Sequence, residues 1–108
     1  MINRKRISDE FFRLASISSP SFHEAEIADY LSQRFRELGG EVEMDETATA
    51  IGGEAGNLIA RFDGVQSTAA PLLLSAHMDT VVPADGVQAV LKDGVFTSAG
   101  DTILGADD

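Results

Sequence analysis

The pair Gly39-Gly40 divides the 108-residue sequence into two parts with different hydrophobic periods. In the first part, apolar residues recur at the spacing of one helix face. The best-defined row is Ile27, Leu31, Phe35 and Leu38. The sequence Ser21-x-x-Glu24 has the form of a capping box, and the two glycines provide a stop. These signals predict a helix that begins near Ser21 and ends at the glycines.

A shorter helical pattern precedes this one. Apolar residues follow the helical period at Ile7, Phe11, Leu14 and Ala15, and Ser8 is the predicted N-cap. Residues 18–20 (SSP) then interrupt the helix. The residues before Gly39-Gly40 therefore predict two consecutive helices.

After the glycines the pattern alternates or becomes continuously apolar, which is typical of strands. Strands are predicted at residues 41–45, 57–62, 72–76, 87–91 and 95–98, the last two as a hairpin. Residues 71–76 (PLLLSA) resemble a strand that is buried on both faces near the centre of a sheet. We therefore predict an α/β fold with two helices followed by a mixed β-sheet, in one domain over residues 1–108.

Charge is distributed unevenly along the chain. Residues 1–40 carry six basic and six acidic side chains, whereas residues 41–108 carry twelve carboxylates against Arg61 and Lys92, so the net charge of −10 arises in the second part. Nucleic acids and anionic membranes bind basic surfaces, so we expect neither as a partner. Acidic residues follow the basic N-terminus at once and leave no apolar signal segment, and no apolar run is long enough to span a bilayer. We expect a cytoplasmic protein.

His77 and Asp79 directly follow the predicted buried strand. Alternate residues of an extended chain project to the same side, so these two side chains are expected to lie together. A carboxylate beside a histidine takes one ring N–H and leaves the other nitrogen for a metal ion. The pair would equally suit a catalytic dyad or a purely structural histidine. The chain has no cysteine and no serine in a nucleophile-elbow sequence, which favours a metal site.

A second acidic cluster, GADD, occupies residues 105–108. From His77 onward the chain contains six aspartates, no glutamate, no arginine and one lysine. Crowded carboxylates destabilise each other's ionised forms, and a divalent cation relieves this cost. Asp85 and Asp93 each precede a glycine and are explained by turn chemistry, whereas the cluster is not explained as easily.

Together these motifs resemble a known family. The sequences LLSAHMDTV at residues 73–81 and TILGADD at residues 102–108 are similar to those of peptidase T-like proteins, within the family of two-zinc aminopeptidases, carboxypeptidases and aminoacylases. The resemblance extends to residues 19–24 (SPSFHE) and 56–58 (GNL). Gly100-Asp101 departs from the family pattern, in which aspartate precedes glycine. The resemblance implies the N-terminal part of a zinc-peptidase-like three-layer fold.

The same resemblance implies a reaction and a site. It assigns His77 as a zinc ligand, Asp79 as the catalytic residue that orients this histidine, and Asp107 as the bridge between two divalent metal ions, expected to be zinc. It leaves Asp108 and Asp101 without a definite role. The implied reaction releases N-terminal residues from short peptide substrates by two-metal hydrolysis, in which a bridging water is acidified and the scissile carbonyl is polarised.

Other parts of such an active site are missing from the sequence. Relatives also use a Glu-Glu pair, a further carboxylate and a second histidine. The other histidine here, His23, is not part of a His-Glu-x-x-His signature, because Ile27 takes the place of the second histidine. We therefore expect a truncated chain that is inactive alone. Its exposed edges or uncovered apolar faces can drive association, so the oligomeric state stays open, with a homodimer as one option. The alternatives are a related carboxypeptidase or aminoacylase, a non-catalytic metal-binding or interaction fragment, and an acidic domain without a site.

Overall fold

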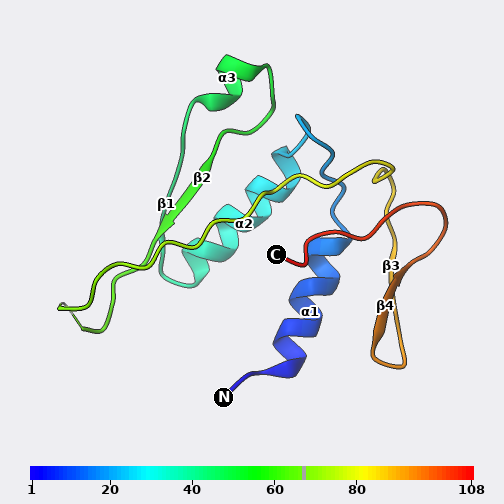
Figure 1. Cartoon of the computed structure of the whole chain (residues 1–108), viewed down its shortest axis with the longest axis horizontal. Helices are drawn as coiled ribbons and strands as arrows, with labels where there is room; N and C mark the ends of the chain where they lie inside the picture. Colours follow the sequence, from blue (N-terminus) through cyan, green and yellow to red (C-terminus); the bar gives the residue numbers. More distant parts are fainter. Residues whose placement is uncertain (67) are drawn as a thin grey trace.

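The computed structural model describes residues 1–66 and 68–108. It contains helices followed by two small antiparallel sheets (Figure 1). The helices are α1 (Arg4–Ala15), α2 (Ala25–Glu37) and α3 (Thr47–Ile51). The strands are β1 (Glu41–Met44), β2 (Leu58–Arg61), β3 (Ala89–Lys92) and β4 (Val95–Ser98). No helix among the described residues has the length and apolar character needed to cross a membrane.

Both predicted long helices are confirmed, but they begin at different residues from those expected. The N-cap of α1 is Asn3, whose side chain accepts a hydrogen bond of 3.0 Å from the Arg6 amide. The predicted cap, Ser8, lies inside the helix, because Arg4-Lys5-Arg6 are good helix formers and extend it by a turn. The boundary prediction was therefore wrong by one helical turn.

The predicted capping box of α2 is not formed. The Ser21 hydroxyl donates to the Asp79 carboxylate, while Glu24 accepts from the Phe22 amide at 2.8 Å. Helix α2 begins only at Ala25 and has no side-chain cap. An N-cap hydrogen bond is worth about 0.5–2 kcal/mol. A long-range contact has thus displaced a local one that the sequence pattern predicts.

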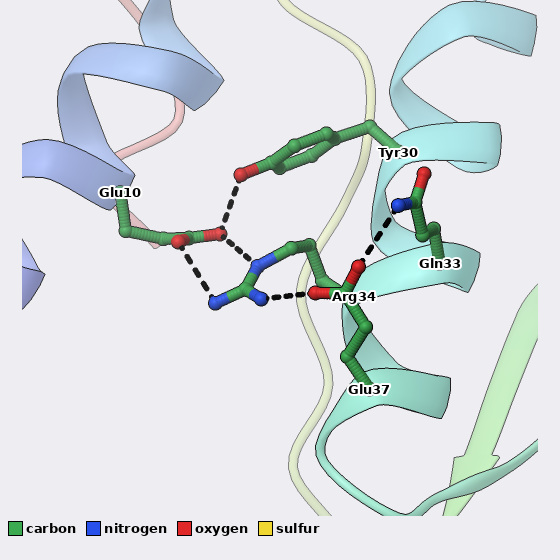
Figure 2. Close-up of polar contacts among 5 residues, drawn as sticks. All are labelled: Glu10, Tyr30, Gln33, Arg34 and Glu37. Atoms are coloured by element: carbon green, nitrogen blue, oxygen red, sulfur yellow. Dashed lines mark hydrogen bonds and ion pairs between the residues drawn. The ribbon is translucent and has the colours of Figure 1, made fainter.

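A polar cluster joins α1 to α2 (Figure 2). Glu10 of α1 accepts hydrogen bonds from Tyr30 Oη at 2.8 Å and from Arg34 Nε and Nη2 at 3.2 and 3.3 Å. Arg34 also contacts Glu37, which accepts a bond of 2.8 Å from Gln33. The Glu10 and Arg34 side chains are 33% and 29% exposed, so water screens this pair less than a fully exposed one.

Each two-stranded sheet packs on its own helix. Strands β1 and β2 pair with Val42 opposite Ala60 and contact α2, where Phe35 and Phe62 stack edge to face at 6.1 Å. Strands β3 and β4 contact α1 through Phe11 and Phe96, whose ring centroids are 4.8 Å apart. The two sheets lie on opposite sides of the helix pair (Figure 1).

The hairpin predicted between β3 and β4 is confirmed. Asp93 and Gly94 both have positive φ values, 52° and 78°. Positive φ at both central residues defines the type I′ turn, which matches the twist of the adjoining strands. This element follows directly from the Asp-Gly sequence.

The predicted central strand is not present. Residues 71–78 have no regular secondary structure, and no described strand pairs with them. Leu72, Leu73 and Leu74 are 84, 88 and 83% exposed. The prediction of a mixed sheet was therefore wrong, because β1 pairs with β2 and β3 with β4, which leaves this segment without a neighbour. The chain is also less compact than a typical domain of this size. Its radius of gyration is 15.5 Å, compared with ~13 Å for a compact domain.

The connection between β1 and β2 contains α3 and is organised by Asp45. The Asp45 carboxylate accepts hydrogen bonds from the Thr47 amide at 3.0 Å and from the Asn57 amide and side chain, each at 2.8 Å. These bonds, together with that from the Thr47 hydroxyl, hold the pKa of Asp45 well below its usual range. The backbone comes so close that a Cβ placed on Gly56 would lie 2.1 Å from the Asp45 carbonyl oxygen.

Replacing Gly56 with alanine should therefore lower the free energy of unfolding by about 1–3 kcal/mol, the usual cost of overpacking. Gly53→Ala is the matched control in the same connection, because its new methyl group would meet Ile51 at an ordinary 3.6 Å. The control should be neutral or raise stability by about 0.5 kcal/mol. Urea denaturation followed by circular dichroism measures both, and equal stabilities would contradict the close approach at Gly56.

The Glu10 cluster predicts a pH-dependent stability. Burial raises the pKa of Glu10, but the hydrogen bonds from Arg34 and Tyr30 outweigh it, so the pKa lies below its ordinary value. The ionised Glu10 carboxylate stabilises the folded state at pH values above the pKa of about 4.3 that glutamate has in the unfolded chain. This stabilisation is lost as the pH falls through the lower pKa of Glu10 in the folded chain. Glu10→Gln should remove about 1 kcal/mol at neutral pH and flatten this acid dependence.

The matched control is Asp9→Asn on the same helix. Asp9 pairs with Lys5 in an exposed i,i+4 contact, so its loss should change stability by less than about 0.5 kcal/mol. Unfolding free energies measured for both variants across the acidic range test the prediction. Identical pH profiles for Glu10→Gln and the unaltered chain would show that the cluster does not stabilise the helix pair.

Candidate metal site around His77

Residues 77–80 are held in place by the segment that connects α1 to α2. The Thr80 amide donates a hydrogen bond of 2.7 Å to the Ser19 carbonyl, and Pro20 and Thr80 form an isolated parallel bridge. Ser19 is only 2% exposed, so this backbone contact is shielded from water. The segment that carries His77 and Asp79 thereby acquires a fixed position, although the leucines before it are unpaired.

The His77 ring is oriented through its Nδ1 atom. This nitrogen lies 2.7 Å from the Asp79 carbonyl oxygen and 3.1 Å from Asp79 Oδ1. Both partners are acceptors, so they place the ring proton on Nδ1 and leave the lone pair of the neutral imidazole on Nε2. The side-by-side placement predicted from the i,i+2 spacing is present. The backbone carbonyl, the closer of the two acceptors, was not predicted.

The Nε2 atom of His77 faces the second acidic cluster. Asp108 Oδ2 lies 3.4 Å away. A neutral Nε2 and an ionised carboxylate are both electron-pair donors, so they can lie face to face favourably only when a proton or a metal cation is shared between them. Zinc ligands at ~2.0–2.2 Å and at the tetrahedral angle are ~3.4 Å apart. The observed separation therefore fits two ligands of one zinc ion.

Gly105 brings the second cluster to this position. A Cβ added at Gly105 would lie 2.5 Å from Thr80 Cγ2, so the C-terminal segment rests directly on Thr80 without space for a side chain. Figure 1 shows this segment (red) returning to the middle of the molecule. Gly105 of the second motif thus packs directly on Thr80 of the first.

The described residues bring together few side chains that could bind a metal ion. Asp107 and Asp101 are exposed, and neither makes an ion pair with the other described residues. No group of three or more His, Cys, Asp or Glu side chains that could hold a metal ion occurs in residues 1–66 and 68–108. The metal-binding role of His77 and the bridging role of Asp107 therefore stay predictions.

The electrostatics of the pair suit a metal ligand and its partner. The hydrogen bond to the Asp79 backbone and the charge of Asp108 raise the pKa of His77. The Ser21 hydroxyl is the largest of the influences that lower the pKa of Asp79, with His77 adding to it and burial opposing it. Asp79 is therefore an ionised carboxylate at neutral pH, as an orienting partner of histidine must be.

Two residues that contact the His77–Asp79 pair were not identified from the sequence. Asp108 had no assigned role, and Ser21 was interpreted as a helix cap. The doubling of aspartate was a signal for the first, but no local pattern indicates that Ser21 reaches Asp79 across 58 positions. His23, by contrast, lies at the surface, where its Nδ1 contacts Glu54 at 3.0 Å.

The sequence and the fold resemble the N-terminal part of peptidase T-like peptidases, as the sequence motifs indicated. No family model matches the chain. Its whole length is 44% identical to YqjE of Bacillus subtilis. It is also 31% identical, over 92% of its length, to the cytosol non-specific dipeptidase of Escherichia coli.

Two solved structures are similar to the chain. The crystal structure of aminopeptidase PepT from Bacillus cereus matches 99% of it with a TM-score of 0.92 and 42% identity. A tripeptidase from Staphylococcus aureus matches all of it with a TM-score of 0.91 and 40% identity. The chain spans 29% of YqjE and 21% of the dipeptidase, and 29% of each solved chain. The likeness therefore concerns one part of these longer proteins.

Proposed function

We propose that the chain is the N-terminal part of a zinc-dependent peptidase that releases N-terminal residues from short peptides. The observation that carries the proposal is the His77 ring, whose Nδ1 is occupied by Asp79 and whose Nε2 faces Asp108 at 3.4 Å. This arrangement lies in a chain whose structure superimposes on an aminopeptidase with a TM-score of 0.92. Geometry and similarity thus support the same chemistry.

Each site residue has a distinct proposed role. His77 binds zinc through Nε2, and Asp79 keeps the ring oriented and basic by accepting its Nδ1 proton. Asp108 would supply a carboxylate to the same ion, and Asp107 would be the residue shared with a second ion. Zinc bound here would polarise the scissile carbonyl and acidify a water molecule.

Three relatives carry names that favour short peptides as substrates: an aminopeptidase, a tripeptidase and a dipeptidase. The name of the dipeptidase also favours a cytosolic location. The concentration of acidic residues after Gly40 supports a partner other than nucleic acid or an anionic membrane. Formation of a homodimer stays a prediction. Alone, the 108 residues are proposed to be inactive, because they lack the Glu-Glu pair, the further carboxylate and the second site histidine that the family resemblance implies.

The proposal is best tested in a chimera in which residues 1–108 replace the matching part of the Bacillus cereus aminopeptidase. The chimera should bind zinc and hydrolyse tripeptides. His77→Ala should lower kcat/KM by about 10³-fold, because a zinc ligand and the several kcal/mol of charge stabilisation at that ion are lost. Asp79→Asn should cost about 10–100-fold, the range for an orienting partner of a ligand.

His23→Ala is the matched control, because it removes the other histidine of the chain and leaves His77 unchanged. This variant should retain the activity and zinc content of the chimera. The proposed function is wrong if a folded chimera is inactive, or if His77→Ala behaves like His23→Ala.

The placement of Asp108 can be tested separately through Gly105. A methyl group there would overlap Thr80 and push the C-terminal segment away, so Gly105→Ala should weaken zinc binding by about 10-fold. Gly64→Ala is the control, because its methyl group would come no closer than 3.8 Å to Gln66. Competition with a chelator measures the affinities in the chimera. Equal affinities would show that Asp108 does not contribute through this contact.

A further inference from the structure

A hydroxyl group outside the two motifs contacts the site. Ser21 Oγ donates a hydrogen bond to Asp79 Oδ2, while the other carboxylate oxygen, Oδ1, lies 3.1 Å from His77 Nδ1. Each carboxylate oxygen of Asp79 thus has a partner of its own. A carboxylate held at both oxygens cannot rotate freely about its Cβ–Cγ bond, whereas one held at a single oxygen can.

The backbone of the α1–α2 connection presents Ser21 to Asp79. The Ser19 carbonyl accepts the Thr80 amide at 2.7 Å, and the Pro20–Thr80 bridge continues this pairing. The seryl side chain is short and has one torsion that places its oxygen, so little freedom is lost in forming the contact. The hydroxyl is therefore positioned by the fold and not by a flexible side chain.

Two acceptors compete for the Nδ1 proton of His77. The Asp79 carbonyl lies 2.7 Å away and does not depend on Ser21, whereas the carboxylate at 3.1 Å does. Only the carboxylate carries a negative charge that strengthens the bond and raises the basicity of Nε2. Loss of the Ser21 hydroxyl should therefore weaken the orientation of the ring without abolishing it.

We infer that Ser21 is a positioning residue of this site: its hydroxyl holds the Asp79 carboxylate against the His77 ring and keeps Nε2 directed toward Asp108. The consequence for zinc binding rests on the proposed function. The Ser21–Asp79–His77 contacts themselves do not, and they can be tested in the absence of metal.

Nitrogen NMR of the His77 ring in the metal-free 108-residue chain tests the inference, recorded above the pH range in which the ring titrates. Ser21→Ala should move the Nδ1 and Nε2 resonances part of the way toward those of Asp79→Ala. The double variant should match Asp79→Ala alone, because Ser21 acts through Asp79 and the two effects are not additive. Unchanged ring resonances in a folded Ser21→Ala variant would overturn the inference.

Two further variants separate positioning from general structure. Ser21→Thr keeps the hydroxyl and should retain the original resonances. Ser18→Ala removes a neighbouring hydroxyl that donates to Asp85 at 3.2 Å, and should also leave the ring unchanged. Should Ser21→Ala not fold, Ser21→Cys replaces it, since a thiol is a weak donor. Original ring resonances in Ser21→Cys would then contradict the inference.

Zinc titration of the same variants provides the second readout. Ser21→Ala should lower the zinc affinity by about 10-fold, the lower end of the range for partners of metal ligands. If His77→Ala leaves the zinc affinity of the chain unchanged, the proposed function fails while the ring resonances still decide the role of Ser21. A zinc affinity that depends on His77 but not on Ser21 would overturn the inference alone.

Discussion

The hydrogen bond between the Thr80 amide and the Ser19 carbonyl connects the two halves of this chain. It is 2.7 Å long, and Ser19 is almost completely buried, so water cannot readily replace it. It places Ser21 beside Asp79 and presents Thr80 as the surface on which Gly105 packs. Three segments that are far apart in the sequence meet around this contact, and the candidate metal site forms where they meet.

The remainder of the fold is built from units that are largely separate. Each two-stranded sheet is supported by one helix, and the helices are joined by the Glu10 cluster. The most apolar segment, residues 71–76, has no partner among the described strands and exposes its leucines.

The site shows how a small donor set can still be well oriented. His77 Nε2 and Asp108 Oδ2 lie 3.4 Å apart, and the ring is held by two acceptors from Asp79. Residues of this chain therefore orient the His77 ring, but those that the structure describes do not provide a complete set of metal ligands. Because the orientation of the His77 ring and the number of metal ligands are independent properties, ring geometry and zinc affinity can change separately when Ser21 is replaced.

The sequence by itself determined the helices α1 and α2, the Asp93-Gly94 hairpin and the proximity of His77 to Asp79, because helical period, turn chemistry and i,i+2 spacing act between near neighbours. Only the tertiary structure decided that residues 71–78 are unpaired, that Asp108 faces His77, and that Ser21 contacts Asp79 instead of capping α2. These outcomes depend on which distant segments pack together. A hydrophobic run indicates that its residues favour burial, but it does not indicate which other segment will pack against them.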